Sequence, residues 1–69
     1  MNRQPVSSSN IASIGYDAAL QILEVEFLNG SVYHYLNVPE AEYDALMAAG
    51  SHGTYLNAYI KPRYPYQKQ

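Results

Sequence analysis

The clearest pattern along the chain lies in residues 20–27, where apolar and acidic side chains alternate from residue 23 to residue 27. Leu23, Val25 and Phe27 alternate there with two glutamates. Successive side chains of an extended chain point to opposite faces, so a period of two is typical of a strand with one buried face. This segment is the strongest strand prediction in the sequence.

Two further β-rich runs flank this strand. Residues 10–16 place Ile11, Ile14 and Tyr16 around a glycine, and residues 32–36 read Val-Tyr-His-Tyr-Leu. Between the second and third runs, Asn29 and Gly30 are residues that tolerate a positive φ, which favours a hairpin. The three runs together predict a three-stranded antiparallel meander.

The apolar spacing changes from that of a strand to that of a helix after residue 38. Pro39 suits a first helical turn, and Tyr43, Leu46 and Met47 follow at helical spacing until Gly50. A second short helix or turn is expected over residues 52–60, before a proline interrupts it. The predicted fold class is therefore α+β, with a three-stranded antiparallel β-meander followed by two short helices packed on one face.

The register of the predicted hairpin decides which way Tyr33 and Tyr35 point. A two-residue Asn-Gly turn would place both tyrosines beside the glutamates on the outer face. A three-residue loop, with Gly30 as a left-handed bulge residue, would instead set Val25 opposite Tyr33 and Leu23 opposite Tyr35. We favour the bulged register, because it keeps the glutamates and the intervening histidine in water and the apolar side chains together.

Length and composition bound the domain organisation. The chain has 69 residues and no cysteine, so we expect one thin core without disulfides, in a cytoplasmic protein with no membrane partner. Residues 1–9 are polar and small and are expected to form a flexible lead-in to a domain over residues 10–64. Residues 65–69 are expected to be a tail that is either docked by its tyrosines or frayed.

Charge is unevenly distributed, although the net charge is only −2. Residues 59–69 hold three cations and no carboxylate, and they interleave Lys61 and Arg63 with Tyr59 and Tyr64. Cations alternating with flat rings are what proteins use to hold phosphates and stack unpaired bases. The plainer interpretation is a tail that packs its tyrosines and solvates its charges.

A second candidate for anion binding is the segment Ser51, His52, Gly53 and Thr54. A helix start beside a glycine exposes backbone N–H groups that can receive a phosphate. The alternative is an ordinary turn between helices, in which Ser51 caps the second helix. Capping alone explains a serine and a glycine at these positions.

No strong catalytic or ligand-binding motif is present. The chain lacks a glycine-rich phosphate loop, a His-Glu-x-x-His pair, a Gly-x-Ser-x-Gly elbow and zinc-ligand spacing. We therefore expect no catalytic residue, no metal site and no cofactor. His34 or His52 with a nearby carboxylate could in principle form an acid–base pair, so an enzymatic role is kept as a third hypothesis.

Four short motifs in order resemble the KTSC domain, a family named for a segment at the C-terminus of some lysyl-tRNA synthetases. The resemblance covers residues 9–64 and is carried by Asn10-Ile11…Ile14-Gly15-Tyr16-Asp17, Leu23-x-Val25-x-Phe27-x-Asn29-Gly30, Val32-Tyr33-x-Tyr35-x-x-Val38-Pro39 and Ser51-x-Gly53-x-Tyr55-x-Asn57-x-x-Ile60. The family's central Tyr-x-Tyr falls on Tyr33 and Tyr35. The resemblance implies a role with RNA by association, which the net acidic charge does not favour.

Two hypotheses from different classes follow. The first is a non-enzymatic binding module for RNA or tRNA, weak and salt-dependent, that uses the basic end and the turn at Ser51. The second is a protein-interaction or self-association module that uses the acidic sheet face or an exposed strand edge. Tyr33, Tyr35, Asn29 and Gly30 are expected to be mainly structural.

Overall fold

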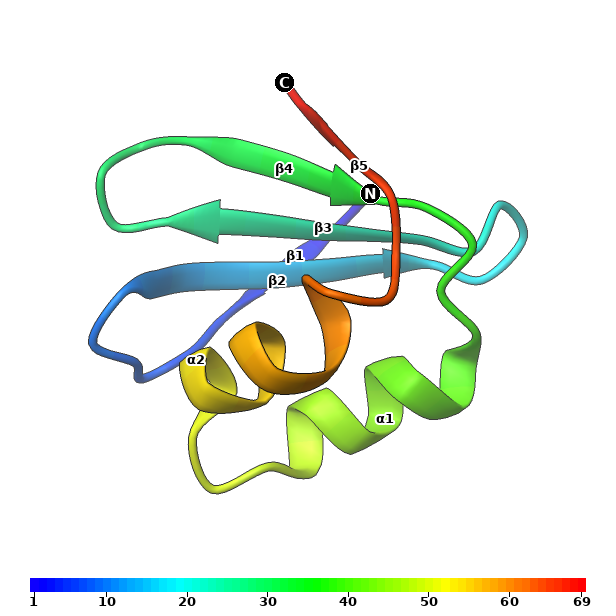
Figure 1. Ribbon diagram of the computed structural model, residues 1–69. Coiled ribbons are helices and arrows are strands. Elements are labelled where there is room, and N and C mark those ends of the chain that lie inside the picture. The colour runs from blue at the N-terminus through cyan, green and yellow to red at the C-terminus, as the bar shows by residue number, and fades with distance from the viewer.

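Two helical segments lie against one face of an antiparallel sheet in the computed structural model, which describes residues 1–69 (Figure 1). In chain order the elements are β1 (Arg3–Pro5), β2 (Ile11–Asp17), β3 (Ile22–Phe27), β4 (Val32–Tyr35), α1 (Glu40–Ala48), α2 (His52–Tyr55), the π-helical turn η1 (Leu56–Ile60) and β5 (Tyr66–Lys68). The α+β class and the two helices on one face are as predicted. None of the helices has both the length and the apolar character required to cross a bilayer.

The sheet has five strands in the order β1-β2-β3-β4-β5, and the prediction of three was wrong. The two extra strands are the edges, each three residues long, and they lie in the segments expected to be a lead-in and a tail. All of their residues are exposed. A composition argument misses such strands, because main-chain hydrogen bonds to a neighbour hold them and no buried side chain is needed.

A glycine in β2 lets β1 approach closely. Arg3 pairs with Gly15 in the β1–β2 ladder, and a Cβ at Gly15 would lie 2.9 Å from the carbonyl oxygen of Asn2. Only a residue without a side chain fits beneath that backbone. The first residues of the chain therefore pair with β2 and pass close over Gly15.

At the other edge, β5 brings the end of the chain back beside the hairpin. Tyr66 pairs with Tyr35 and Lys68 with Tyr33, and the Leu36 N–H donates to the Pro65 carbonyl at 2.8 Å. Of the two alternatives for the tail, the docked one is observed. Docking uses the main chain as well as the tyrosine rings.

The bulged hairpin register is confirmed. Val25 lies opposite Tyr33 and Leu23 opposite Tyr35, and Gly30 has a φ of 92°. The loop is closed by two bonds to Phe27, whose N–H donates to Ser31 O at 2.8 Å and whose carbonyl accepts from Gly30 N at 2.9 Å. The alternation of side chains predicts this register because it is the one that separates the apolar from the charged side chains of both strands.

The helices begin and end close to where proline, serine and glycine predict. α1 follows Pro39 and carries two glutamates in its first turn, where the helix dipole favours negative charge. Ser51 caps α2 by accepting a hydrogen bond from Thr54 N. The second helix then widens into η1, which ends with the Lys61 N–H donating to Leu56 O at 2.9 Å, one residue before Pro62.

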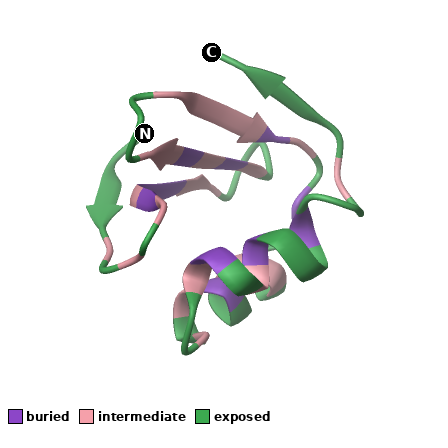
Figure 2. Cartoon of the chain, turned by 60° about the vertical axis from the view of Figure 1, so that its left-hand side comes forward, coloured by how far each residue is buried: buried purple, intermediate pink, exposed green.

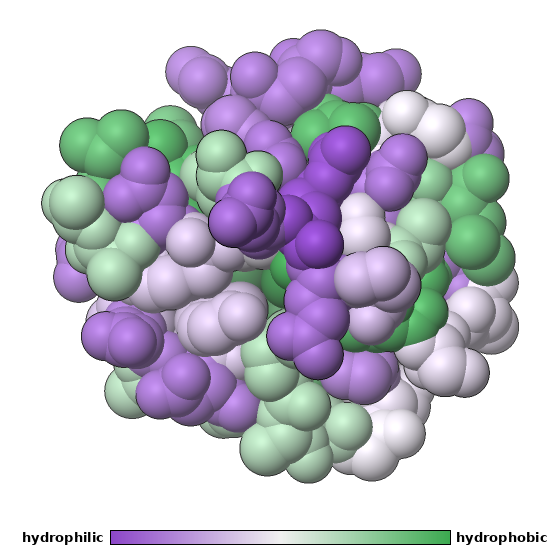
Figure 3. Space-filling view, turned by 180° about the vertical axis from the view of Figure 1, so that it is seen from behind, coloured by the Kyte–Doolittle hydropathy of each residue, from purple (hydrophilic) through white to green (hydrophobic).

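The core lies between the sheet and the helices. Nine fully or almost fully buried hydrophobic residues form it: Ile11, Ile14, Leu23, Val25, Tyr35, Val38, Leu46, Leu56 and Ile60. Buried residues recur along the central strands and in both helical segments, whereas the two edge strands are exposed (Figure 2). The side opposite that of Figure 1, which β1 crosses, gathers hydrophilic side chains over its middle (Figure 3).

Candidate functional site

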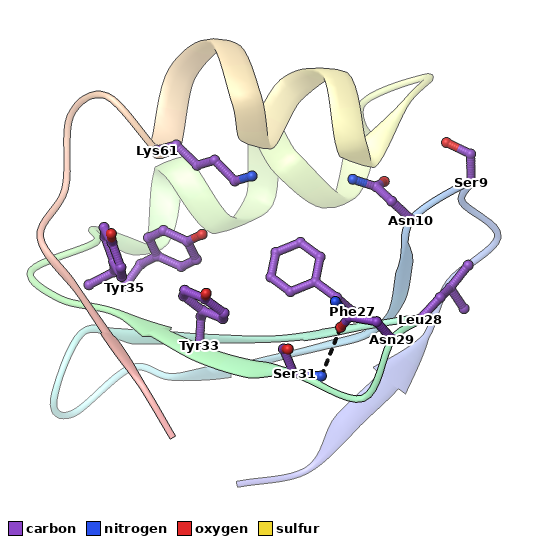
Figure 4. A pocket seen from close by; sticks show the side chains of 10 residues that line it. Ser9, Asn10, Phe27, Leu28, Asn29, Ser31, Tyr33, Tyr35 and Lys61 are labelled. Carbon is purple, nitrogen blue, oxygen red and sulfur yellow. Dashed lines mark hydrogen bonds between the residues drawn. The ribbon is translucent and has the colours of Figure 1, made fainter.

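An open cleft of about 610 Å³ lies between the β3–β4 hairpin and the end of η1 (Figure 4). It is lined by Ser9, Asn10, Phe27, Leu28, Asn29, Ser31, Tyr33, Tyr35, Lys61 and Tyr66. Lys61 and Asn10 reach toward one another from opposite ends of the cleft, while Phe27 and Tyr33 stand up from the sheet below them. The volume is within the range of a small-molecule site.

Four aromatic rings form one side of this cleft. The ring of Tyr33 meets Phe27 edge-to-face with centroids 5.5 Å apart, and it lies 5.5 Å from Tyr66. Tyr35 lies 6.0 Å from Tyr66. Alternation along β3 and β4 places the rings of Phe27, Tyr33 and Tyr35 on the helix-facing side. The pairing of β5 with β4 brings the ring of Tyr66 beside them.

The hydroxyl groups distinguish these tyrosines from Tyr16, Tyr55 and Tyr64, whose hydroxyls hold the fold together. Tyr16 donates to Val38 O, and both Tyr55 and Tyr64 donate to Glu42. No hydrogen bond within the chain involves the hydroxyl of Tyr33, Tyr35 or Tyr66. Tyr35 is almost fully buried, and a buried tyrosine normally finds a partner for its hydroxyl, so the free Tyr35 hydroxyl beside the cleft indicates room for a polar ligand.

Burial differs sharply among the three cleft tyrosines. Tyr35 is 2% exposed and belongs to the core, Tyr33 is half-buried, and Tyr66 is 59% exposed. Burial is the main cause that raises the pKa of Tyr35 to about 12, and the neighbouring Tyr33 and Tyr66 add to it. The raised pKa keeps the Tyr35 hydroxyl protonated, and so able to donate a hydrogen bond, further into the alkaline range than an ordinary tyrosine.

The cleft also holds one of the two lysines that form no salt bridge. Of the four cations in the sequence, Arg3 pairs with Glu24 at 3.5 Å and Arg63 with Glu42 at 3.3 Å. Lys61 and Lys68 form no salt bridge. The ammonium group of Lys61 lies 5.4 Å from the centroid of the Phe27 ring.

Lys68 stands on the same side of the sheet as the cleft. It is the ladder partner of Tyr33, and directly paired residues of antiparallel strands project to the same face. Among the residues that line the cleft there is no aspartate or glutamate. The site is thus cationic although the protein is acidic.

The structure brings together four of the residues singled out from the sequence: Tyr33, Tyr35, Asn29 and Lys61. Gly30 lies in the turn beside them and sets its geometry. The Oδ1 atom of Asn29 accepts from Ser31 N at 2.9 Å, which fixes the loop at the mouth of the cleft. The family motif therefore marks both the hairpin and the cleft that it forms.

The turn at Ser51 lies outside the cleft and forms its own hydrogen bonds. Ser51 Oγ accepts from Thr54 N at 3.2 Å and donates to Thr54 Oγ1 at 3.0 Å. A Cβ on Gly53 would lie 2.5 Å from Asn10 Oδ1, so close packing explains this glycine. His52 has its Nδ1 buried without a partner. Anion binding at this turn stays a prediction.

The basic, tyrosine-rich end is split between two places. Arg63 and Tyr64 turn toward Glu42 of α1, whose side chain is 10% exposed and receives a third donor, Tyr55. Tyr59 is 50% exposed and packs against Tyr55 with centroids 4.8 Å apart. Only Lys61 of this group reaches the cleft, so the four residues form no continuous surface.

A close histidine–carboxylate pair is present, but not in the cleft. His34 Nε2 lies 2.7 Å from Glu24 Oε1, on the face that Arg3 also covers. Neither residue lines the cleft. The pair forms part of a small charge network on the outer sheet face.

Sequence reasoning missed several residues of the cleft. Tyr66 and Asn10 enter it only because β5 and the segment before β2 pack beside the hairpin, and no local pattern encodes that proximity. Phe27 was expected on the helix-covered face, where it packs partly buried against the core, but its place in the cleft lining was not predicted. The one signal in the sequence that could have indicated Tyr66 as a cleft residue is its spacing from a cation, because Lys68 follows two residues later.

Comparison with known proteins assigns the chain to a family. A model of the KTSC domain matches residues 7–64. A KTSC domain protein from Yersinia pestis, known from a crystal structure, is 43% identical and superposes with a TM-score of 0.93, covering 99% of this chain and 96% of that one. Sequence and fold agree over nearly the whole length.

Relatives include both small proteins and parts of larger ones. A protein of Tsukamurella paurometabola is 48% identical over 88% of this chain and 91% of its own length. An uncharacterized protein of Stutzerimonas stutzeri is 44% identical, over 93% of this chain and 90% of its own. A lysine–tRNA ligase of Nostoc punctiforme is 35% identical over 87% of this chain, which corresponds to 11% of the ligase. The chain therefore belongs to the KTSC domain family.

Proposed function

We propose that this protein is a non-enzymatic module that binds single-stranded RNA weakly, in the cleft between the hairpin and the end of η1. The observation that carries the proposal is the position of two unpaired lysines, Lys61 over the Phe27 ring and Lys68 opposite Tyr33, beside tyrosines whose hydroxyls are free. Rings beside cations are the usual means of holding a single strand without strict sequence preference.

The relatives support the same direction. Lysine–tRNA ligases carry a segment similar to this chain, and their name states that they act on tRNA. A domain of this kind attached to such an enzyme would increase the local concentration of RNA at the larger protein. In a small protein the same surface would act alone.

Weak binding follows from the charge. Two lysines can neutralise about two phosphates, which gives a shallow but measurable dependence on salt. The six carboxylates lie away from the cleft lining, so they lower long-range attraction without blocking the site. We expect affinity in the micromolar range or weaker, best seen at low ionic strength.

The test is fluorescence anisotropy with labelled single-stranded RNA and tRNA at low and moderate salt. Lys68→Ala should weaken binding about threefold, in line with the loss of one exposed charge contact. Arg3→Ala removes the same charge from the opposite face and should leave binding within experimental error. Absence of binding at high micromolar protein in low salt would exclude the function.

A second candidate function is assembly through the sheet edges. Both outer strands, β1 and β5, have one side without a strand partner, and an open edge can accept another strand. The acidic face is less suited, because Glu24 and Glu26 are held by Arg3, His34 and Ser13. Light scattering over a concentration series tests this candidate, and a strictly monomeric protein would count against self-association.

A further inference from the structure

We propose that the cleft holds one unpaired nucleotide, with its base against Tyr66 and Tyr33 and its phosphate near Lys61 and Lys68. This inference rests on the RNA-binding function proposed above and names the part of the RNA that is recognised. It follows from the size of the cleft, its rings, its amide groups and the position of its charges.

Size limits the occupant to a small unit. A volume of about 610 Å³ fits a ligand of ordinary small-molecule dimensions, whereas a duplex groove contact needs an extended surface. The whole domain measures only 27 × 24 × 22 Å. A single strand would therefore place one nucleotide in the cleft while its neighbours remain outside.

The base would lie against the exposed aromatic surface. Tyr66 is 59% exposed, and its ring lies 5.5 Å from that of Tyr33, so both present surface at the mouth of the cleft. A flat heterocycle gains stacking energy on such rings whatever its identity. The free hydroxyl of Tyr33 is placed to meet a polar group of the sugar or base.

Amide groups at the other end of the cleft suit the edge of a base. Asn10 Oδ1 is occupied by the hydroxyl of Ser8 at 3.1 Å, and Asn29 Oδ1 by the N–H of Ser31 at 2.9 Å. The Nδ2 group of neither amide donates a hydrogen bond within the chain, so both remain available to a ligand. Ring nitrogens and carbonyl oxygens of bases are the acceptors that such amides contact.

The phosphate has a favourable position at the lysines. Lys61 lies over the ring of Phe27 at 5.4 Å rather than in a salt bridge, so an anion can reach its ammonium group without displacing a carboxylate. Lys68 projects beside Tyr33 from the other edge. Aromatic rings alone would also suit a cationic ligand, but the ammonium group of Lys61 repels a cation and no carboxylate lines the cleft, which favours an anionic ligand.

The inference is tested by titrating isotope-labelled protein with adenosine 5′-monophosphate, adenosine and inorganic phosphate, each separately, and following amide NMR shifts. The nucleotide should shift the signals of residues 29–31, 61 and 66–68. Adenosine should bind more weakly by about tenfold, because it lacks the phosphate, and phosphate alone should bind more weakly still. Saturating nucleotide should displace labelled RNA from the protein.

Matched tyrosine variants separate stacking from general effects. Tyr66→Ala should weaken nucleotide binding about tenfold, and Tyr66→Phe, which keeps the ring, should restore most of it. Tyr59→Ala removes a similarly exposed ring that lies outside the cleft and should leave binding unchanged. Equal effects of the two alanine variants would overturn the inference.

The outcomes also distinguish this inference from the function on which it rests. If RNA binds but the nucleotide neither shifts the cleft signals nor competes, the one-nucleotide site is wrong and RNA binding stands. If neither RNA nor nucleotide binds at low salt, both are wrong. If phosphate binds as well as the nucleotide, the lysines bind an anion and the base site is wrong.

Discussion

At the scale of single residues, Glu42 and the cleft tyrosines show two different uses of a hydroxyl group. Glu42 is almost buried, and it accepts from Tyr55, Tyr64 and Arg63. The hydroxyls at the cleft make no such bonds. Folding therefore uses the first group, and ligand binding is proposed to use the second.

Replacing Glu42 by alanine should lower the free energy of unfolding by about 2 to 3 kcal/mol, because hydrogen bonds to a charged acceptor are lost and two tyrosine hydroxyls lose their partner. Urea denaturation measures the loss. Glu40→Ala, in the same first turn of α1 but without a hydrogen bond to another element, should cost less than about 1 kcal/mol. Similar losses for the two variants would contradict this account of Glu42.

Removing hydroxyl groups one at a time tests the distinction between the tyrosines. Tyr55→Phe should destabilise the fold by about 1.5 kcal/mol, because its bond to the carboxylate of Glu42 is lost. Tyr35→Phe removes a hydroxyl without an internal partner and should change the stability by less than about 0.5 kcal/mol. A larger loss for Tyr35→Phe than for Tyr55→Phe would show that the Tyr35 hydroxyl has a structural partner.

At the scale of elements, the hairpin and its glycine determine where the aromatic rings point. Gly30 has a φ of 92° and no atom near the position of a Cβ, so the backbone conformation is its only requirement. Gly30→Ala should cost about 1 to 2 kcal/mol in a thermal or urea unfolding experiment. Gly50→Ala, which also has open space but no positive φ, should be neutral or slightly stabilising.

Equal stability of these two glycine variants would contradict the bulged turn. It would also remove the physical reason for Val25 to face Tyr33.

Alternation made the central strands predictable, and edge strands escaped the same reasoning. Leu23 and Val25 must be buried, so a one-residue shift would expose them and the register is determined by the sequence. Nothing in β1 or β5 is buried, so their positions depend on main-chain pairing and on Gly15. Lys61 was singled out from the basic end of the chain, and Tyr33 and Tyr35 from a motif expected to be structural, whereas Tyr66 and Asn10 needed the tertiary structure.

At the scale of the whole molecule, the protonation of buried and half-buried tyrosines makes the free energy of unfolding depend on pH in the alkaline range. The hydrogen bond to Glu42 is the main cause that raises the pKa of Tyr55, to about 12. The pKa of Tyr64 is raised mainly by burial and, to a smaller extent, by its hydrogen bond to Glu42. Burial also raises the pKa of Tyr16 and Tyr35. The folded state therefore retains protons that the unfolded state releases above its ordinary tyrosine pKa of about 10.

The sign of the effect follows. The stabilisation is complete below about pH 10, and it declines as pH rises toward 12, because the unfolded chain then binds fewer protons. Urea denaturation at pH 8, 10 and 11 should show constant stability and then a fall. Tyr55→Phe should make the fall smaller, and a rise in stability between pH 10 and 11 would contradict the assignment.

The dependence of RNA affinity on salt tests the central claim most directly. For single-stranded RNA, contact of Lys61 and Lys68 with two phosphates predicts a slope of about −1.4 in a plot of log affinity against log salt. The Lys61→Ala and Lys68→Ala double variant should bring the slope close to zero while remaining folded. An unchanged slope in the double variant would place the RNA elsewhere on the protein and contradict the cleft as its site.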